Sequence, residues 1–131
     1  MNKLNAFLDL HPHIETFEVL LPDINGHLRG KWVSRDKMAK VFEGGFKLPV
    51  STLAFDIWGR DIGKTVFDDG DADGICLADA DSLAPVPWLA RPTGQVLVSM
   101  GTVHGECYDG DPRAVLASVL QRYARLGLCP V

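Results

Sequence analysis

The order of its predicted elements places this chain in the α+β class, with a β-grasp arrangement. Three observations predict this fold: a β-hairpin near the N-terminus, one amphipathic helix directly after it, and further strands after the helix. A helix that lies across one face of a mixed sheet buries the apolar sides of both layers. With 131 residues, the chain is long enough for one such core and too short for two full domains.

The first two predicted elements are a short helix and a strand. Leucine and phenylalanine recur at helical spacing over residues 2–10, which predicts an amphipathic helix. Residues 15–21 alternate with a period of two, which predicts a strand with one face formed by Phe17, Val19 and Leu21.

The hairpin turn is predicted at Asn25-Gly26, because both residues tolerate positive φ. The strand then returns over residues 27–33. Two basic residues of this strand, Arg29 and Lys31, share one face. They are either charges at a subunit interface or part of a solvated strand face, and the sequence leaves both interpretations open.

The helix of the predicted core follows the hairpin directly. Ser34 is expected to cap it, since a serine hydroxyl can accept a hydrogen bond from the free amides of the first turn. The helix is expected to end at Gly44-Gly45. Its apolar side is formed by Met38, Val41 and Phe42.

The second half of the predicted sheet is assembled from shorter segments. Residues 52–57 are predicted to form a strand that ends in a glycine loop, and residues 60–74 a long surface loop. Residues 75–78 and 95–103 are predicted strands. Between them, the prolines of residues 85–88 favour an extended segment.

One more helix closes the sequence. Asp111 is the predicted N-cap, Pro112 occupies the first helical position, and Gly127 ends the helix. The helix needs a surface to bury against, either its own sheet or a partner beyond Val131, and the sequence favours the second. Its apolar face is formed by Val115, Leu116, Val119, Leu120 and Tyr123.

Composition and charge indicate a soluble, intracellular domain, which we expect in the cytoplasm. No apolar run approaches the roughly 20 residues of a membrane-spanning helix, and the N-terminus does not resemble a secretory leader. Thirteen basic and seventeen acidic side chains give a net charge of −4, which argues against a nucleic-acid partner. The three cysteines form no C-x-x-C pattern and are expected to be free thiols.

The acidic segment Asp69-x-Asp71-x-Asp73-Gly74 matches the opening of a calcium-binding EF-hand loop. Its twelfth position, however, is Ala80, where an EF-hand has a bidentate glutamate. The flanking segments are also predicted as loop and strand rather than helix. A solvated acidic turn is therefore expected here, with calcium binding as the alternative, and we predict no metal ligands in this chain.

A carboxylate stands at the end of one predicted strand. Asp56 lies close to Gly59, so a loop could carry its side chain outside its own fold, where it could accept a proton or hold a cation. A plain capping role for this aspartate is the alternative.

Several stretches of the chain occur together in one family. The chain resembles the N-terminal region of the glutamine synthetase family, in the branch that includes the glutamate–polyamine ligases. The matching stretches run in the family's order and span most of the chain from about Phe17 to Gly127. They are residues 23–31, residues 53–59, residues 70–74, residues 85–88 and residues 111–116.

The resemblance implies a β-grasp domain over residues 1–106 and the first helix of a catalytic domain over residues 107–131. Family members phosphorylate glutamate with ATP and Mg²⁺ or Mn²⁺, and then let ammonia or an amine displace the phosphate. They assemble into rings of identical subunits, in which this domain covers a neighbour's active site. By position Asp56 would be the aspartate that it contributes, and Trp58 and Arg60 would be lesser substrate-binding candidates.

Two departures from the family pattern matter. The ammonia-using branch continues F-D-G-S-S where this chain has Phe55-Asp56-Ile57-Trp58-Gly59, and a bulky indole favours an alkylamine or polyamine over ammonia. The family's metal, ATP and glutamate ligands follow the last helix, so we expect this chain to bind no cofactor itself and to be inactive alone. The rival interpretation is a non-catalytic β-grasp module that binds a protein partner.

Overall fold

The computed structural model describes residues 3–62, 70–102 and 104–130. A short helix precedes the hairpin, and a mixed helical segment follows it. The helices and strands, in chain order, are α1 (Lys3–Leu10), β1 (Thr16–Pro22), β2 (Leu28–Ser34), α2 (Met38–Lys40), β3 (Phe46–Pro49), β4 (Asp73–Ala78), β5 (Ala84–Pro85), β6 (Thr93–Gly101) and α3 (Pro112–Arg125).

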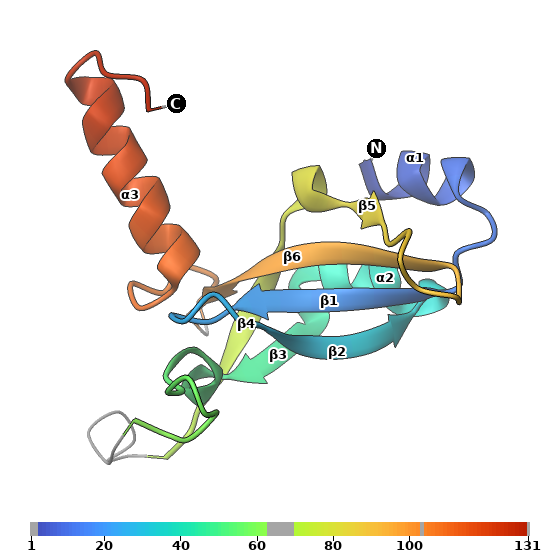
Figure 1. Ribbon diagram of the computed structural model, residues 1–131, viewed down its shortest axis with the longest axis horizontal. Helices are drawn as coiled ribbons and strands as arrows, with labels where there is room; N and C mark the ends of the chain where they lie inside the picture. The colour runs from blue at the N-terminus through green and yellow to red at the C-terminus, as the bar shows by residue number, and fades with distance from the viewer. Residues whose placement is uncertain (1–2, 63–69, 103, 131) are drawn as a thin grey trace.

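The strands form one mixed sheet with the order β2-β1-β6-β4-β3, and β5 pairs with β6 outside this path. β1 and β6 run parallel in the centre, and the other pairs are antiparallel. Figure 1 shows α2 behind this sheet. The hairpin, the helix across the sheet and the central parallel pair confirm the predicted α+β class and β-grasp arrangement.

The core lies between the sheet and the helical segment around α2. Phe17, Val19 and Leu21 of β1 are fully buried, as their alternation predicted. Met38 and Val41 close the core from the helical side. Each such side chain contributes roughly 1.5–3 kcal/mol through the apolar surface that it removes from water.

The hairpin turn is longer than a two-residue Asn-Gly turn. The amide of Gly26 donates to the carbonyl oxygen of Asp23 at 3.0 Å, and the amide of Asp23 donates to that of His27 at 2.8 Å. Only Gly26 takes a positive φ, of 77°. Asn25 keeps an ordinary backbone, which leaves its side chain available for a contact elsewhere.

The predicted core helix forms, but as a mixed segment. A 3₁₀ turn over Arg35–Lys37 leads into α2, and a π turn over Val41–Gly45 ends it at Gly44, whose φ is 78°. Ser34 occupies the N-cap position with extended backbone, yet its side chain makes no capping hydrogen bond. The predicted serine cap is wrong in this respect.

The predicted strand over residues 52–57 is also wrong. The edge strand in this region is β3, a four-residue segment in which Phe46 and Leu48 alternate toward the core. A 3₁₀ turn over Val50–Leu53 follows it and buries Leu53, and residues 54–62 form a loop. The apolar residues that suggested a strand are divided between this turn, which buries Leu53, and the loop that follows it.

The strands predicted at residues 75–78 and 95–103 correspond to β4 and β6. Of the predicted surface loop over residues 60–74, residues 63–69 lie outside the described part. In the parts of the chain that the structure describes, no helix has the length and apolar character needed to cross a membrane.

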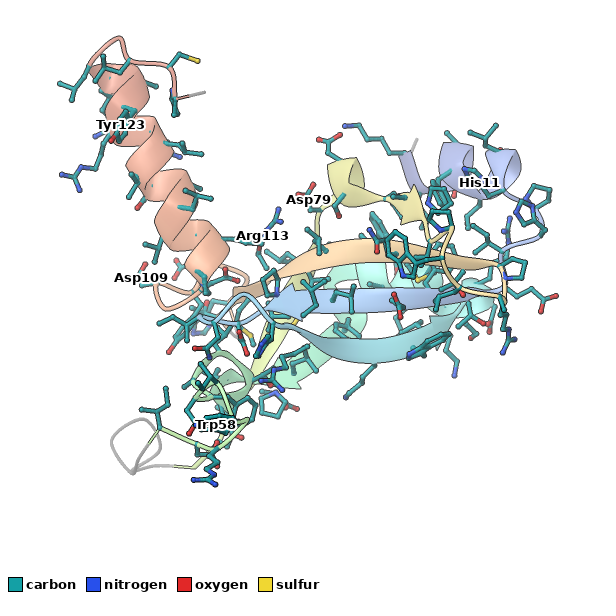
Figure 2. All side chains as sticks on the ribbon, in the orientation of Figure 1. His11, Trp58, Asp79, Asp109, Arg113 and Tyr123 are labelled. Atoms are coloured by element: carbon teal, nitrogen blue, oxygen red, sulfur yellow. The ribbon has the colours of Figure 1, made fainter. Side chains whose placement is uncertain are left out.

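The last helix is capped as predicted. Asp111 is fully buried, and its Oδ1 accepts from the amides of Arg113 and Ala114 at 2.7 and 3.3 Å, while its Oδ2 accepts from the amide of Met100. Arg113 also pairs with Asp79 at 2.5 Å, and Figure 2 shows Arg113 at the base of α3 and Asp79 on the segment that follows β4.

Beyond this base, α3 extends away from the sheet (Figure 1). Its apolar face is therefore exposed, with exposed fractions between 36% for Val119 and 57% for Leu116. The predicted division between residues 1–106 and residues 107–131 stays a prediction, although the helix does not pack on the sheet.

Candidate functional site

The loop of residues 54–62 is organised around the side chain of Asp56. Its Oδ1 accepts hydrogen bonds from the amides of Trp58 and Arg60, both at 2.8 Å. Its own amide donates to the carbonyl oxygen of Arg60 at 2.8 Å, and Gly59 allows the tight return with a φ of 77°. One carboxylate oxygen therefore holds the loop in shape, and within residues 3–62, 70–102 and 104–130 no hydrogen bond reaches the other.

The three predicted site residues lie together on this loop. Asp56 is half-buried, whereas Trp58 and Arg60 are exposed, with 75% of the Trp58 surface accessible. Figure 2 shows Trp58 on the part of the molecule that projects beyond the ends of the strands, away from α3. The indole and the carboxylate can therefore reach a molecule outside this chain, and their chemical role stays a prediction.

The hairpin turn holds this loop in place. Asn25 donates from its side-chain amide to the carbonyl oxygen of Phe55 at 2.7 Å. The guanidinium of Arg29 lies 5.3 Å from the centre of the Phe55 ring, a distance at which a cation is attracted to an aromatic face. Two contacts from the hairpin thus fix the residue directly before Asp56.

A buried carboxylate organises the hairpin side of this contact. Asp23 is only 1% exposed. Its Oδ1 accepts hydrogen bonds from the backbone amides of Asn25 and His27, at 2.8 and 2.9 Å. Its Oδ2 accepts a hydrogen bond from Nε of Arg29 at 3.0 Å. Burial alone would raise the pKa of Asp23, but the hydrogen bonds from His27, Arg29 and Asn25 outweigh it and lower that pKa. The carboxylate therefore stays charged and holds the turn and Arg29 together.

Of the two basic residues, Arg29 is partly buried and paired with Asp23, whereas Lys31 is exposed, so the solvated-face interpretation fits Lys31 and not Arg29. Strand register places Arg29 opposite Leu21 and Lys31 opposite Val19, so both basic side chains start from the core face of β2. The exposed face of the strand carries Leu28 and Trp32 instead. Pairing the two strands of the hairpin places Arg29 opposite the buried Leu21, and this register was the signal that could have predicted its position on the core face.

The acidic segment does not assemble a metal site in the described residues. Both carboxylate oxygens of Asp71 accept hydrogen bonds from Ser51, from its amide at 3.1 Å and from its hydroxyl at 2.6 Å. Asp73 opens β4, and Asp69 lies outside the described residues. Across residues 3–62, 70–102 and 104–130, no group of three or more His, Cys, Asp or Glu side chains could hold a metal ion.

Comparison with known proteins supports the resemblance to the glutamine synthetase family. No protein-family model matches the chain. Over 131 residues, however, it is 31% identical to γ-glutamylputrescine synthetase PuuA of Escherichia coli (strain K12), a match that covers 98% of this chain and 28% of that protein. This chain is a relative of the glutamine synthetase-type ligases. A glutamine synthetase of Pyrococcus abyssi (strain GE5 / Orsay) is 27% identical over 113 residues, which are 85% of this chain and 22% of that protein.

Solved structures support the same relationship. GmaS in complex with ADP superimposes on this glutamine synthetase relative with a TM-score of 0.74 and 25% identity, over 95% of this chain and 26% of that one. A novel glutamine synthase homologue reaches the same TM-score at 15% identity, over 86% of this chain and 27% of that one, and at this identity shows the fold alone. The chain spans about a quarter of the length of the curated relatives that it matches.

In this glutamine synthetase relative, two stretches that carry the family resemblance lie side by side. Residues 23–31 form the hairpin turn and the start of β2, and residues 53–59 form the end of the 3₁₀ turn and the first part of the loop that carries Asp56. The contacts of Asn25 and Arg29 with Phe55 join them. Sequence reasoning found the loop but missed Asp23, which fixes the hairpin turn, and Phe55, the loop residue that Asn25 and Arg29 contact.

Proposed function

We propose that this chain is the N-terminal part of an ATP-dependent glutamate–amine ligase and completes the amine site of a neighbouring subunit in a ring-shaped homo-oligomer. The observation that carries the proposal is the match to γ-glutamylputrescine synthetase, which runs through the Asp56 loop and nearly the whole chain. The projecting loop supports it, because its side chains are available to another subunit.

The proposed role of Asp56 is to attract the amine substrate and to remove its proton. The substrate arrives as a cation, and only its neutral form has a lone pair that can attack the activated carboxylate of glutamate. A carboxylate stabilises the cation by its charge and then accepts the proton. Oδ1 accepts from the amides of Trp58 and Arg60, and among the described residues nothing donates to Oδ2, so we propose Oδ2 as the oxygen that receives the amine.

The preferred amine is proposed to be a polyamine or alkylamine rather than ammonia. Trp58 lies two residues from Asp56 and exposes 75% of its surface. An indole can cover the methylene groups of an alkylamine and attract its distal ammonium through the ring face. Ammonia has no methylene groups to use such a surface. Arg60, on the same loop, is the lesser candidate for contact with glutamate or with the transferred phosphate.

Nucleotide and metal are proposed to bind outside this chain. When bound, ATP and Mg²⁺ or Mn²⁺ would convert the carboxylate of glutamate to an acyl phosphate. The part of the site that we propose for this chain is the amine side, which the Asp56 loop would supply. The chain alone is therefore expected to be inactive.

The test is a chimera in which this chain replaces the matching region of the E. coli γ-glutamylputrescine synthetase. ADP release is measured with glutamate and ammonia, methylamine, putrescine or spermidine, after light scattering has confirmed assembly. We expect turnover in the chimera, none in the chain alone, and the highest rate with a polyamine. An assembled chimera that stays inert with every amine would contradict the proposal and favour the non-catalytic module.

Two substitutions assign the role of Asp56. Asp56→Asn keeps an oxygen that can accept from the amides of Trp58 and Arg60, so the loop keeps its shape while the charge is lost. We expect the chimera to lose about 100-fold or more in kcat with this variant, the scale of a general base. Asp9→Asn, an exposed position on α1, is the matched control and should leave the rate unchanged.

A further inference from the structure

A basic groove lies between the two edges of the sheet, apart from the Asp56 loop. It has a volume of about 500 Å³ and is bordered by β2, by the helical segment around α2 and by β3. Four of the six lysines of the chain line it, namely Lys31, Lys37, Lys40 and Lys47. The one carboxylate in its lining is that of Asp73, so the groove carries an excess of three positive charges in a chain of net charge −4.

Two of these lysines are positioned by an aromatic ring and by a glycine rather than by carboxylates. The ammonium group of Lys31 lies 6.0 Å from the centre of the Phe46 ring, so it reaches from β2 toward β3. The aliphatic stem of Lys40 runs across Gly45, where an added Cβ would lie 2.4 Å from its Cγ, 2.9 Å from its Cε and 2.8 Å from the Lys40 carbonyl oxygen. Gly45 is thus the residue that gives this stem its path along the groove.

None of the four lysines forms an ion pair within residues 3–62, 70–102 and 104–130. Clustered ammonium groups repel one another, and that repulsion is relieved by an anion bound among them. The groove also runs between β2 and β3, the two ends of the sheet order, where each strand has backbone groups without a strand partner. Backbone amides at such edges can donate to an anion together with the lysines.

We propose that this groove binds a compact polyanion that carries two or more phosphate groups. An ammonium group is a small point charge with three donors, a form of cation that proteins use to bind phosphate. A monovalent anion would leave most of the excess charge unbalanced. The volume falls within the range of small-molecule sites, which favours a compact ligand over a long acidic peptide.

The groove is separate from the proposed amine site. None of residues 54–62 lines it, and the contacts that hold the Asp56 loop come from the hairpin turn rather than from the groove. The inference therefore does not depend on the proposed ligase activity, and it can be tested on this chain alone.

The first experiment is a calorimetric titration of the chain with inorganic triphosphate at a constant ionic strength of about 0.15 M, which screens weak surface attraction. Lys31→Gln and Lys40→Gln are each expected to weaken binding about tenfold or more, because each removes a charged hydrogen-bond donor. Lys3→Gln is the matched control: it removes the same charge from α1, where Lys3 pairs with Asp81, and should change the affinity less than twofold.

A second variant separates geometry from charge. Gly45→Ala removes no charge but places a methyl group against the stem and the carbonyl oxygen of Lys40, so Lys40 must shift and we expect triphosphate binding also to weaken severalfold. Circular dichroism and thermal unfolding confirm that each variant is folded. Equal weakening by Lys3→Gln, or unchanged affinity in Lys31→Gln and Lys40→Gln, would overturn the proposal.

A parallel titration with ATP distinguishes the sources of the phosphate. Tighter binding of ATP than of inorganic triphosphate identifies a nucleotide ligand, and equal binding identifies the phosphate chain as the recognised group. Both results support a polyphosphate site. Sulfate that binds as tightly as triphosphate contradicts it, since a single divalent anion would then satisfy the groove.

Discussion

The side-chain amide of Asn25 donates to the carbonyl oxygen of Phe55 at 2.7 Å, across thirty residues of sequence. This bond joins the hairpin turn to the residue before Asp56. The turn is itself fixed by the buried carboxylate of Asp23, which accepts from the amides of Asn25 and His27. The hairpin therefore helps to position the Asp56 loop, although the two segments do not pair as strands.

Asn25→Ala is expected to loosen the loop of residues 54–62 without unfolding the chain. Loss of one partly exposed hydrogen bond costs about 1 kcal/mol. Amide hydrogen exchange should speed up at Trp58 and Arg60, whose N–H groups donate to Asp56. Asn5→Ala, on the exposed side of α1, is the control. Unchanged exchange in the loop of the Asn25 variant would show that the hairpin does not hold it.

The stabilising contribution of the Asp23 carboxylate should be lost in acid. Its pKa is lower in the folded chain than the ordinary 3.8, so the unfolded chain binds the proton first as the pH falls. Its contribution to the free energy of unfolding is therefore complete above the unfolded pKa and is lost as the pH falls through the folded value. Arg29 and His27 are the groups that face this carboxylate, with Arg29 Nε 3.0 Å and His27 Nδ1 3.9 Å from its Oδ2.

The measurement for Asp23 is urea unfolding of the natural chain and of Asp23→Asn between about pH 6 and about pH 2. The stability difference between the two should be largest at the upper end and should shrink below the ordinary pKa of 3.8. Asp9→Asn should run parallel to the natural chain throughout. A constant difference for Asp23→Asn would mean that the carboxylate does not titrate with unfolding.

Local signals in the sequence predicted the central elements well. The alternation of Phe17, Val19 and Leu21 predicted β1, because a half-buried strand repeats every two residues. Asp111 and Gly127 predicted both ends of α3, because capping depends on a few neighbouring residues. These features need no knowledge of the rest of the fold.

Features that depend on distant contacts were not predicted. Residues 52–57 have the composition of a strand, but the sheet pairs β3 with β4 and leaves them as a turn and a loop. The bond between Asn25 and Phe55 joins two segments that no local pattern connects. The position of Arg29 opposite Leu21 could be predicted only once the register of the hairpin was known. The candidate loop was thus predicted, but the contacts of Asn25 and Arg29 that hold it were not.

Asp111→Ala should destabilise the junction between β6 and α3. The carboxylate is fully buried and accepts from the amides of Met100, Arg113 and Ala114, which would lose their partner. A loss of about 1–3 kcal/mol in the free energy of unfolding is expected for such buried groups. Asp109→Ala, two residues earlier and exposed (Figure 2), should change stability by less than about 0.5 kcal/mol.

The three thiols should differ in reactivity. Cys76 is buried in β4, and burial raises its pKa to about 11, whereas Cys107 and Cys129 are exposed. Because the thiolate is the reactive form, two thiols should react quickly with an aromatic disulfide reagent in the folded chain and the third only after unfolding in urea. Cys76→Ala should leave the fast phase intact. Three fast thiols in the folded chain would contradict the buried position of Cys76.

The apolar face of α3 should be dispensable in this chain and essential in an assembled ligase. Leu116 and Leu120 are 57% and 41% exposed, so Leu116→Glu should change the stability of the isolated chain by less than about 0.5 kcal/mol. Met38→Ala, at a fully buried position, should cost about 2–5 kcal/mol by comparison.

In the chimera with γ-glutamylputrescine synthetase, the same Leu116→Glu change should abolish assembly, because the proposed function requires the rest of the enzyme to cover this face. Sedimentation velocity measures assembly, and urea unfolding measures stability. A large stability loss in the isolated chain together with normal assembly of the chimera would show that α3 buries this face within the chain. That result would favour the free-standing interaction module over the ligase, since such a module must cover its own helix.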